Sequence, residues 1–161
     1  YNWVTAWVAI TDSNEHNGCM RMWSGSHKDD LKDHNQKFNE GNLLTRGQTV
    51  MNVPTHETTP LILKAGQMSL HHPTVVHGSD LNKSNDRRIG FVIQSYIGTN
   101  VKQVLGKNSV QLARGNDNYN FHKIIERPKS LMNKNDIKIK KQENDNLQEI
   151  FYKGSSKKGT Y

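Results

Sequence analysis

Histidines and arginines gather in one stretch near the middle of the chain, which reads MSLHHPTVVHGSDLNKSNDRR. Successive side chains of a strand point to opposite faces, so His71 and His72 cannot both reach the same centre. His77 ends a short apolar run, and a neutral imidazole there could bind a divalent metal ion. The alternative is a histidine that is simply hydrogen-bonded at the mouth of a barrel. We assign no metal role to His71 or His72.

Arg87 and Arg88 open a segment that is otherwise apolar, RRIGFVIQSYI. If one guanidinium points to water, the other points into the fold, where it needs a bidentate anionic partner. A carboxylate ligand would supply that partner, and the hydroxyl of Ser79 could add a hydrogen bond. An internal salt bridge to Asp80 or Asp86 is the alternative interpretation of the same pattern.

Short apolar runs separated by polar turns must position these side chains. Strands are predicted at residues 2–10, 19–23, 48–53, 60–64, 68–72, 74–77 and 87–97. The first two, joined by the turn TDSNEHNG, predict an antiparallel hairpin. The last is apolar on both faces toward its middle and is predicted to be central in its sheet. Closely spaced strands with long polar connections, such as residues 24–42, predict an all-β barrel or sandwich.

The composition bounds the class of protein. The chain has 161 residues, of which 33% are hydrophobic, and it contains a single cysteine, Cys19. This length fits one domain with one core. One cysteine excludes an internal disulfide framework and predicts a reducing, cytoplasmic location. No apolar run approaches the roughly 20 residues that cross a bilayer, so no membrane partner is expected.

Positive charge is concentrated near the end of the chain. The net charge is +7, and lysines crowd the segments KNDIKIKKQEND and YKGSSKKGTY. A nucleic-acid partner must therefore be weighed. These segments lack the interleaved aromatic residues of a stacking platform, so we favour a solvated tail over nucleic-acid binding. Residues 128–161 are predicted to form a lysine- and asparagine-rich tail with one irregular helix and a disordered end.

Two long segments carry a resemblance to a known family. VTAWVAITDSNEHNGCMRMWSGSHK and LKAGQMSLHHPTVVHGSDLNKSNDRRIGF, together with their separation, resemble the phytanoyl-CoA dioxygenase family over about residues 3–100. Members of this family are iron(II)- and 2-oxoglutarate-dependent oxygenases built on a double-stranded β-helix, or jelly roll. The resemblance implies that residues 1–127 are the C-terminal part of a jelly-roll oxygenase domain, followed by the tail.

The resemblance also implies roles for individual residues. His77 resembles the family's distal iron-ligating histidine, and it is the expected catalytic and metal-binding residue. Arg88 resembles the arginine that pairs with the distal carboxylate of 2-oxoglutarate, and Ser79 resembles the hydroxyl that assists this arginine. Trp7 matches a tryptophan that lines the cosubstrate pocket, whereas Asn82 is expected to be structural. Iron(II) and 2-oxoglutarate are the implied cofactors.

Part of the family's metal site is not matched in the chain. The family places a His-x-Asp pair ahead of the position of Trp7, and this pair would lie before Tyr1. The letters HKD at His27 to Asp29 match a loop that the family has after its second hairpin strand, so we interpret them as structural. One histidine is a poor iron site, and the chain should bind iron weakly. We favour a fragment of a complete enzyme over a short variant without activity.

The resulting hypothesis is a non-heme iron(II)- and 2-oxoglutarate-dependent dioxygenase that hydroxylates a small organic substrate with dioxygen. The carboxylate ligand that separates hydroxylases from halogenases lies in the unmatched pair, and hydroxylation is the commoner reaction. The alternative is a non-catalytic jelly-roll module, or an inactive fragment that lacks the His-x-Asp pair. The sequence sets neither the substrate nor the oligomeric state.

Overall fold

The computed structural model describes residues 2–35 and 48–153. The chain divides into two compact units, of which the first contains the strands that precede Gly98 and the second continues from Gly98. The predicted domain boundary between residues 127 and 128 stays a prediction. The prediction of a disordered end concerns residues beyond Lys153, outside the described part, and the predicted loop at 24–42 is described only up to residue 35.

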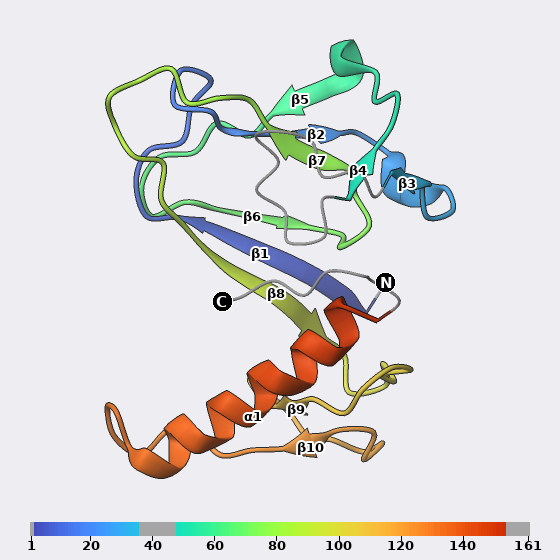
Figure 1. Cartoon of the computed structure of the whole chain (residues 1–161), viewed down its shortest axis with the longest axis vertical. Coiled ribbons are helices and arrows are strands. Elements are labelled where there is room, and N and C mark those ends of the chain that lie inside the picture. The colour runs from blue at the N-terminus through green and yellow to red at the C-terminus, as the bar shows by residue number, and fades with distance from the viewer. Residues whose placement is uncertain (1, 36–47, 154–161) are drawn as a thin grey trace. The chain divides into compact units, whose positions relative to one another are not determined.

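Two antiparallel sheets form the first unit, with strand orders β6-β1-β8 and β5-β2-β7 (Figure 1). The strands are β1 (Trp3–Ala9), β2 (Met20–Trp23), β5 (Thr58–Pro60), β6 (Met68–His71), β7 (His77–Ser79) and β8 (Gly90–Ile97). Shorter elements complete the unit: η1 (Ser26–Lys28), η2 (Thr55–Glu57), and the antiparallel pair β3 (His34–Asn35) and β4 (Thr49–Val50). Two facing sheets of this kind make a jelly roll, which confirms the predicted fold class.

Alternation along β1 places its large side chains between the two sheets. Trp7 and Ala9 are almost fully buried, with exposed fractions of 5% and 0%. Met20 of β2 packs against them from the facing sheet. Partly buried apolar side chains surround this cluster, namely Met22, Leu61 and Leu63. Burial of one large apolar side chain stabilises a fold by about 1.5–3 kcal/mol, so this small core holds the sheets together.

The predicted hairpin between residues 2–10 and 19–23 is wrong. β1 pairs with β6 and β8, whereas β2 pairs with β5 and β7. The connection is free to pass from one sheet to the other because its polar groups are satisfied locally. Asn17 donates from Nδ2 to the carbonyl of Asp12 at 2.8 Å, and its Oδ1 accepts from the N–H of Asn14 at 2.8 Å.

The predicted central position of β8 is also wrong, because β8 is an edge strand of its sheet among the described residues. β1 is the central strand. Phe91, Val92 and Tyr96 of β8 are exposed, and Phe91 exposes 59% of its surface. An apolar run indicates a tendency toward burial, but it does not specify which strand lies alongside.

Two predicted strands begin or end at other residues than expected. β5 ends at Pro60, and beyond it Leu61 still donates to the Met20 carbonyl at 2.7 Å while Leu63 forms an isolated bridge with Ser13. β7 begins only at His77, and Val75 is buried in the turn that precedes it. The chain therefore passes from β6 to β7 through a compact turn rather than through an additional strand.

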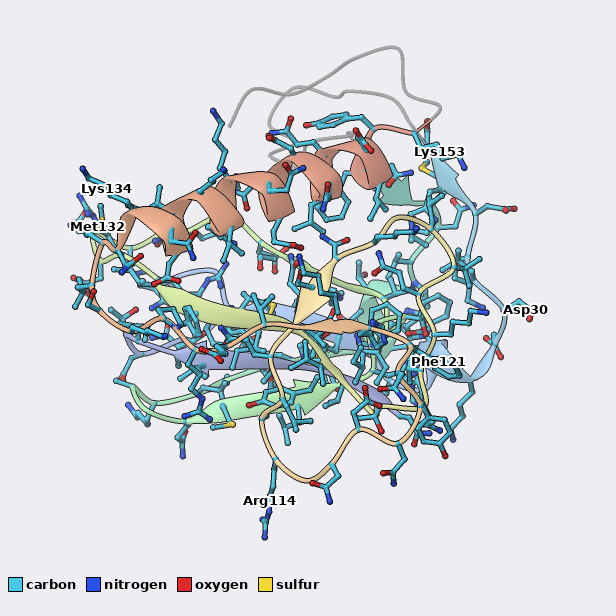
Figure 2. The ribbon with its side chains drawn as sticks, turned by 90° about the horizontal axis from the view of Figure 1, so that it is seen from below. Asp30, Arg114, Phe121, Met132, Lys134 and Lys153 are labelled. Atoms are coloured by element: carbon cyan, nitrogen blue, oxygen red, sulfur yellow. The ribbon has the colours of Figure 1, made fainter. Side chains whose placement is uncertain are left out.

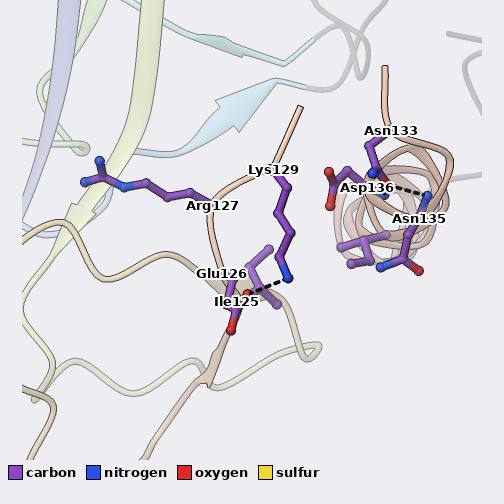
Figure 3. A pocket seen from close by; sticks show the side chains of 8 residues that line it. Ile125, Glu126, Arg127, Lys129, Asn133, Asn135 and Asp136 are labelled. Carbon is purple, nitrogen blue, oxygen red and sulfur yellow. Dashed lines mark hydrogen bonds and ion pairs between the residues drawn. The ribbon is translucent and has the colours of Figure 1, made fainter. Parts of the chain in front are cut away.

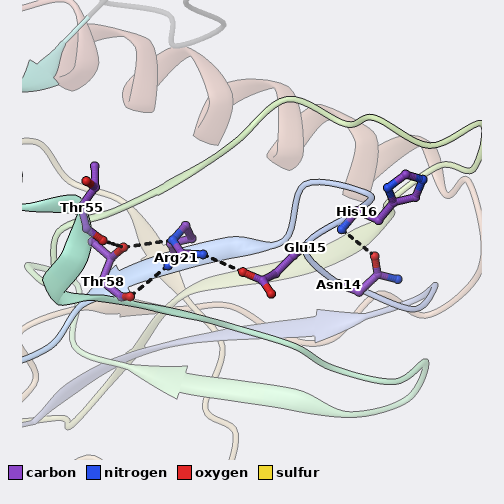
Figure 4. A network of polar contacts seen from close by, with 6 residues as sticks. All are labelled: Asn14, Glu15, His16, Arg21, Thr55 and Thr58. Atoms are coloured by element: carbon purple, nitrogen blue, oxygen red, sulfur yellow. Dashed lines mark hydrogen bonds and ion pairs between the residues drawn. The ribbon is translucent and has the colours of Figure 1, made fainter.

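Arg21 of β2 connects three segments of the first unit (Figure 4). Its Nε donates to Thr58 Oγ1 at 3.0 Å, and its Nη2 donates to the Thr58 carbonyl at 3.1 Å. Its Nη1 pairs with Glu15 at 2.9 Å, in the segment before β2. Thr58 Oγ1 donates in turn to the carbonyl of Thr55 at 2.7 Å. The fixed fork of guanidinium donors thereby holds β5 beside β2.

Among its described residues, the second unit contains two short parallel strands and one helix. β9 (Ser109–Val110) pairs with β10 (Lys123–Ile124), and the loop between them carries Arg114, which projects outward in Figure 2. The helix α1 (Lys134–Phe151) has 18 residues and is regular, whereas an irregular helix was predicted in this segment. It begins after Asn133, whose side chain accepts from the N–H groups of Asn135 and Asp136.

Glu143 attaches α1 to β9. Its carboxylate accepts from the N–H and the hydroxyl of Ser109 at 2.8 Å and 2.7 Å, and from Nδ2 of Asn108 at 3.3 Å. Burial would raise the pKa of Glu143, but the hydrogen bonds outweigh it and the pKa lies below its usual value.

Over the described residues, the structure contains no helix with the length and apolar character needed to span a membrane.

Candidate functional site

Arg88 lies just before β8 and against Trp7. Its guanidinium carbon is 5.7 Å from the centroid of the Trp7 ring, and its Nη2 donates to Ser79 Oγ at 3.2 Å. Its Nε is buried and has no hydrogen-bond partner among the described residues. A buried donor without an acceptor is costly, so this arrangement fits an anionic ligand at the guanidinium edge. The structure thus brings together Arg88, Ser79 and Trp7.

The backbone ahead of β8 fixes the arginine pair. Thr11 Oγ1 donates to the carbonyl of Arg87 at 3.0 Å and accepts from the N–H of Ile89 at 2.8 Å. Arg87 is exposed, whereas Arg88 is half-buried. No ion pair joins Arg88 to a carboxylate in residues 2–35 and 48–153. The alternative of an internal salt bridge to an aspartate of the preceding loop is therefore not observed.

Asn82 organises the loop between β7 and β8. Its Nδ2 donates to the carbonyl of Asp86 at 2.7 Å, and its Oδ1 accepts from the N–H and the hydroxyl of Ser84, both at 2.8 Å. These hydrogen bonds lie within the loop and stabilise the conformation of the segment that connects Ser79 to Arg88. The contacts agree with the structural role expected for Asn82.

His77 opens β7, and its ring is oriented by the preceding turn. Its Nδ1 lies 2.8 Å from the carbonyl of Val75, and since a carbonyl only accepts, Nδ1 carries the proton. The lone pair of Nε2 is then available to a metal ion. The turn is itself held by Ser26, whose buried hydroxyl accepts from the N–H of Val76 at 2.8 Å.

His71 lies beside His77, with ring centroids 5.7 Å apart and an interplanar angle of 57°. β6 pairs Ser69 with Trp7 and His71 with Thr5, so His71 is on the inward face of the sheet. Burial lowers the pKa of His71, and His77 lowers it further, which favours the neutral imidazole. The sequence alone assigned no role to His71, and its inward position follows from strand alternation once the pairing of β6 with β1 is known.

The remaining histidine candidates make local contacts. His72 Nδ1 lies 2.7 Å from Thr74 Oγ1, and the His72 ring is 5.6 Å from that of His27. Asp29 accepts from Lys32 Nζ at 2.7 Å, and this hydrogen bond lowers the pKa of the Asp29 carboxyl. The letters HKD therefore belong to a loop with its own ion pair, in agreement with the structural interpretation.

A complete metal centre is not formed by the described residues. Within residues 2–35 and 48–153, no group of three or more His, Cys, Asp or Glu side chains could hold a metal ion. In the described ranges, His77 and His71 are two imidazoles that no third donor joins to form a metal-binding group. The described residues therefore supply only part of the ligands that an iron ion needs. The surroundings of Arg88, in contrast, fit a carboxylate ligand.

A separate hollow of about 350 Å³ lies in the second unit (Figure 3). It is lined by residues 125–127, by Lys129 and by the first turns of α1. Lys129 Nζ pairs with Glu126 at 3.8 Å, and both side chains are largely exposed. No residue predicted to bind iron or 2-oxoglutarate lines this hollow, so we assign it no part in the candidate site.

Comparisons with known proteins agree with this arrangement. The model of the phytanoyl-CoA dioxygenase (PhyH) family matches residues 2–90. The peroxisomal phytanoyl-CoA dioxygenase of Mus musculus is 30% identical over 86 residues, which are 53% of this chain and 25% of the mouse protein. The Homo sapiens protein is 29% identical over 86 residues, with the same coverage. The match thus spans only about a quarter of these relatives' length.

One solved relative extends over most of the chain. The apo form of ThoJ, a non-heme monooxygenase, has 27% sequence identity and a TM-score of 0.76, and the match covers 92% of this chain and 52% of ThoJ. The ThoJ–nickel complex has 25% identity and a TM-score of 0.72 over 93% of this chain and 51% of ThoJ. The chain therefore matches about half of the length of this non-heme monooxygenase.

Proposed function

The chain belongs to the phytanoyl-CoA dioxygenase family, a family of iron(II)- and 2-oxoglutarate-dependent oxygenases, and we propose that it forms the cosubstrate-binding part of such an enzyme. The reaction proposed for the full-length protein is the hydroxylation of a small organic molecule with dioxygen. The matched residues 2–90 contain Trp7, His77, Ser79 and Arg88, which supports the proposed roles of these residues. The cytoplasmic location stays a prediction from the single cysteine.

The buried Nε of Arg88, which has no hydrogen-bond partner in the described part of the chain, is the observation that carries this proposal. Nε and Nη2 lie on one edge of the guanidinium, and a carboxylate can accept from both at once. Ser79 Oγ lies next to Nη2 at 3.2 Å, and Trp7 provides an aromatic surface beside the cation. A dicarboxylic acid such as 2-oxoglutarate would place its distal carboxylate at this edge.

Iron would use His77 as one ligand, through Nε2. The described residues do not complete the ligand set, since no group of three donors is present among them. One histidine is a poor iron site, so iron binding with full affinity would need further ligands beside His77. The proposal for the chain itself concerns the carboxylate end of the cosubstrate.

Iron and 2-oxoglutarate, when bound, supply the oxidant for hydroxylation of a C–H bond. The residues of the chain would bind the cosubstrate and orient it. Arg88 neutralises the distal carboxylate and holds the keto acid in one orientation, which lowers the entropic cost of the reactive arrangement. Trp7 excludes water from one side of the guanidinium, and the low local dielectric strengthens the ion pair.

Binding of 2-oxoglutarate to the chain tests this proposal. NMR titration of the chain with 2-oxoglutarate should shift the signals of Trp7, Ser79 and Arg88. We expect Arg88→Ala to weaken binding roughly 10- to 100-fold, because a hydrogen bond to a charged group contributes about 1.5–3 kcal/mol. Arg87→Ala is the matched control, since it removes the neighbouring exposed arginine and should leave the affinity within about twofold.

Two outcomes would contradict the proposal. Equal affinities for Arg88→Ala and for the unmodified chain would show that the carboxylate binds elsewhere. Retained 2-oxoglutarate binding without succinate formation by the full-length protein would instead support the alternative of a non-catalytic jelly-roll module.

A further inference from the structure

We propose that Thr11 is a positioning residue for the carboxylate site, because its hydroxyl holds the backbone on both sides of Arg88. The inference rests on the proposed function in one respect, since it takes Arg88 as the residue that binds the distal carboxylate of the cosubstrate. It adds a residue that acts through the orientation of the guanidinium rather than through contact with the cosubstrate.

Arg88 lies beyond the regular hydrogen bonding of its sheet. β1 ends at Ala9 and β8 begins at Gly90, and these two residues are the last pair of the ladder between the two strands. The backbone of residues 87–89 is therefore outside the ladder. The direction in which the Arg88 side chain leaves the backbone depends on the dihedral angles of these residues, so another contact has to fix them.

The hydroxyl of Thr11 supplies this contact. Its Oγ1 donates to the carbonyl of Arg87 at 3.0 Å and accepts from the N–H of Ile89 at 2.8 Å, so one side-chain atom joins the residue before Arg88 to the residue after it. The N–H groups of Ile10 and Thr11 hold the same segment, since they donate to the carbonyl of Ile89 at 2.9 Å and 3.2 Å. A hydroxyl both donates and accepts, whereas a methyl group in its place does neither.

The segment that follows Thr11 also contacts the loop between β7 and β8. A Cβ at Gly18 would lie only 2.6 Å from the carbonyl oxygen of Asp80, so the two segments touch there. The N–H of Lys83 donates to the carbonyl of His16 at 3.0 Å. The loop that carries the carboxylate site is therefore supported along its length by the connection between β1 and β2.

Small displacements of Arg88 matter because its guanidinium has two neighbours to keep at once. Its Nη2 donates to Ser79 Oγ at 3.2 Å, and its guanidinium carbon is 5.7 Å from the centroid of the Trp7 ring. A binding group has to be held within about 0.5 Å of its productive position, and a bidentate contact weakens when this precision is lost. Loss of the Thr11 hydroxyl leaves its two backbone partners to water and lets the segment move.

The alternative explanation is that Thr11 only stabilises the fold, because a hydroxyl that satisfies two groups contributes to stability wherever it lies. Thr58 is a matched case, since its Oγ1 donates to the Thr55 carbonyl at 2.7 Å and accepts from Arg21 Nε at 3.0 Å (Figure 4). It belongs to β5, on the other side of β2 from β7. Thr58→Val therefore removes a hydroxyl of the same kind without touching the segment of Arg88.

An NMR titration of the whole 161-residue chain with 2-oxoglutarate tests the inference. We expect Thr11→Val to weaken binding roughly 3- to 10-fold. Thr11→Ser, which restores the hydroxyl, and Thr58→Val should both stay within about twofold of the unmodified chain. In an Arg88→Ala background, Thr11→Val should cause no further loss, because a residue that acts through Arg88 then has nothing left to position.

The Nε–H signal of Arg88 gives a second measurement, which needs no ligand. This N–H is buried and has no hydrogen-bond partner among the described residues, so its exchange with water reports how well the side chain is held in place. We expect faster exchange in Thr11→Val than in the unmodified chain. Thr11→Ser and Thr58→Val should exchange at the rate of the unmodified chain.

The possible failures are distinguishable. If Thr11→Val weakens binding equally with and without Arg88, or if Thr58→Val weakens it as much, Thr11 is only structural and the inference is wrong. If Thr11→Val changes neither the affinity nor the exchange while Arg88→Ala still weakens binding, this inference is overturned and the proposed function stands. If Arg88→Ala leaves the affinity unchanged, the proposed function fails and this inference fails with it.

Discussion

Trp7 is the residue that joins the core of the first unit to the carboxylate site. It packs with Ala9 and Met20 between the sheets, and the guanidinium of Arg88 lies 5.7 Å from its ring centroid. The backbone of Gly90 passes so close that a Cβ at this position would overlap the Trp7 ring. A glycine is required here by close approach, and the position of the tryptophan therefore depends on it.

Gly90→Ala should destabilise the chain, because a buried tryptophan ring cannot move away without disturbing the core. We expect a loss of about 1–3 kcal/mol in the free energy of unfolding. Urea denaturation followed by tryptophan fluorescence measures it. Gly78→Ala is the control, since nothing lies within 4 Å of a Cβ there. Equal stability of the two variants would show that Trp7 is not packed against Gly90.

The turn between β6 and β7 is the element that sets the position of His77 relative to the rest of the site. Ser26 in η1 donates to the carbonyl of Trp23 at 2.8 Å and accepts from the N–H of Val76 at 2.8 Å. Trp23 also donates from its own N–H to the carbonyl of Val76 at 2.9 Å. One buried serine thus connects the end of β2 to the start of β7.

Ser26→Ala should loosen this turn. The change leaves the half-buried N–H of Val76 without its acceptor, which costs about 1–3 kcal/mol. We expect a lower stability in urea and faster hydrogen exchange at Val76 and His77. Ser24→Ala serves as the comparison, because the exposed hydroxyl of Ser24 contacts only Thr59, at 3.4 Å, among the contacts described. Unchanged exchange at Val76 in Ser26→Ala would refute this role.

At the scale of the whole molecule, each of the two compact units is stabilised internally by a different kind of contact. The first unit has an apolar core around Trp7 between two sheets. The second has a polar anchor, the carboxylate of Glu143, between α1 and β9. Because the anchor depends on charge, the two units should respond differently to acid.

Acid should loosen α1 through Glu143. Its pKa in the folded chain lies below the usual 4.5, so its stabilising contribution is present above pH 4.5 and is lost as the pH falls through the lower folded-state value. Glu143→Gln should cost about 1–2 kcal/mol at neutral pH and remove this pH dependence. NMR shifts of the α1 amides measure both effects, and Glu149→Gln, on an exposed position of α1, is the control.

A pH profile of the α1 shifts that is identical in Glu143→Gln and in the unmodified chain would show that another group is responsible. Lys123 is the charged neighbour whose field also lowers the pKa of Glu143, so its substitution would be the next measurement.

Sequence reasoning was most successful where a residue type restricts its own surroundings. One arginine of a pair that opens an apolar strand is expected to point into the fold, with Ser79 as a possible acceptor, and Arg88 does donate to Ser79. It was least successful for strand pairing. The turn residues around Asn14 predict a hairpin, yet the chain leaves one sheet there and enters the other, with the turn closed by local hydrogen bonds.

The order of residues by itself determined the family, the all-β class and the identity of His77, Ser79, Arg88 and Trp7 as site candidates. These depend on residue types at fixed separations and on strand alternation, which are local properties of the chain. The tertiary structure alone decided that β1 is the central strand, that the Nε of Arg88 is left without a partner, and that His71 lies beside His77. The physical reason is that each of these depends on which face of one sheet packs against the other, and that packing is a long-range property.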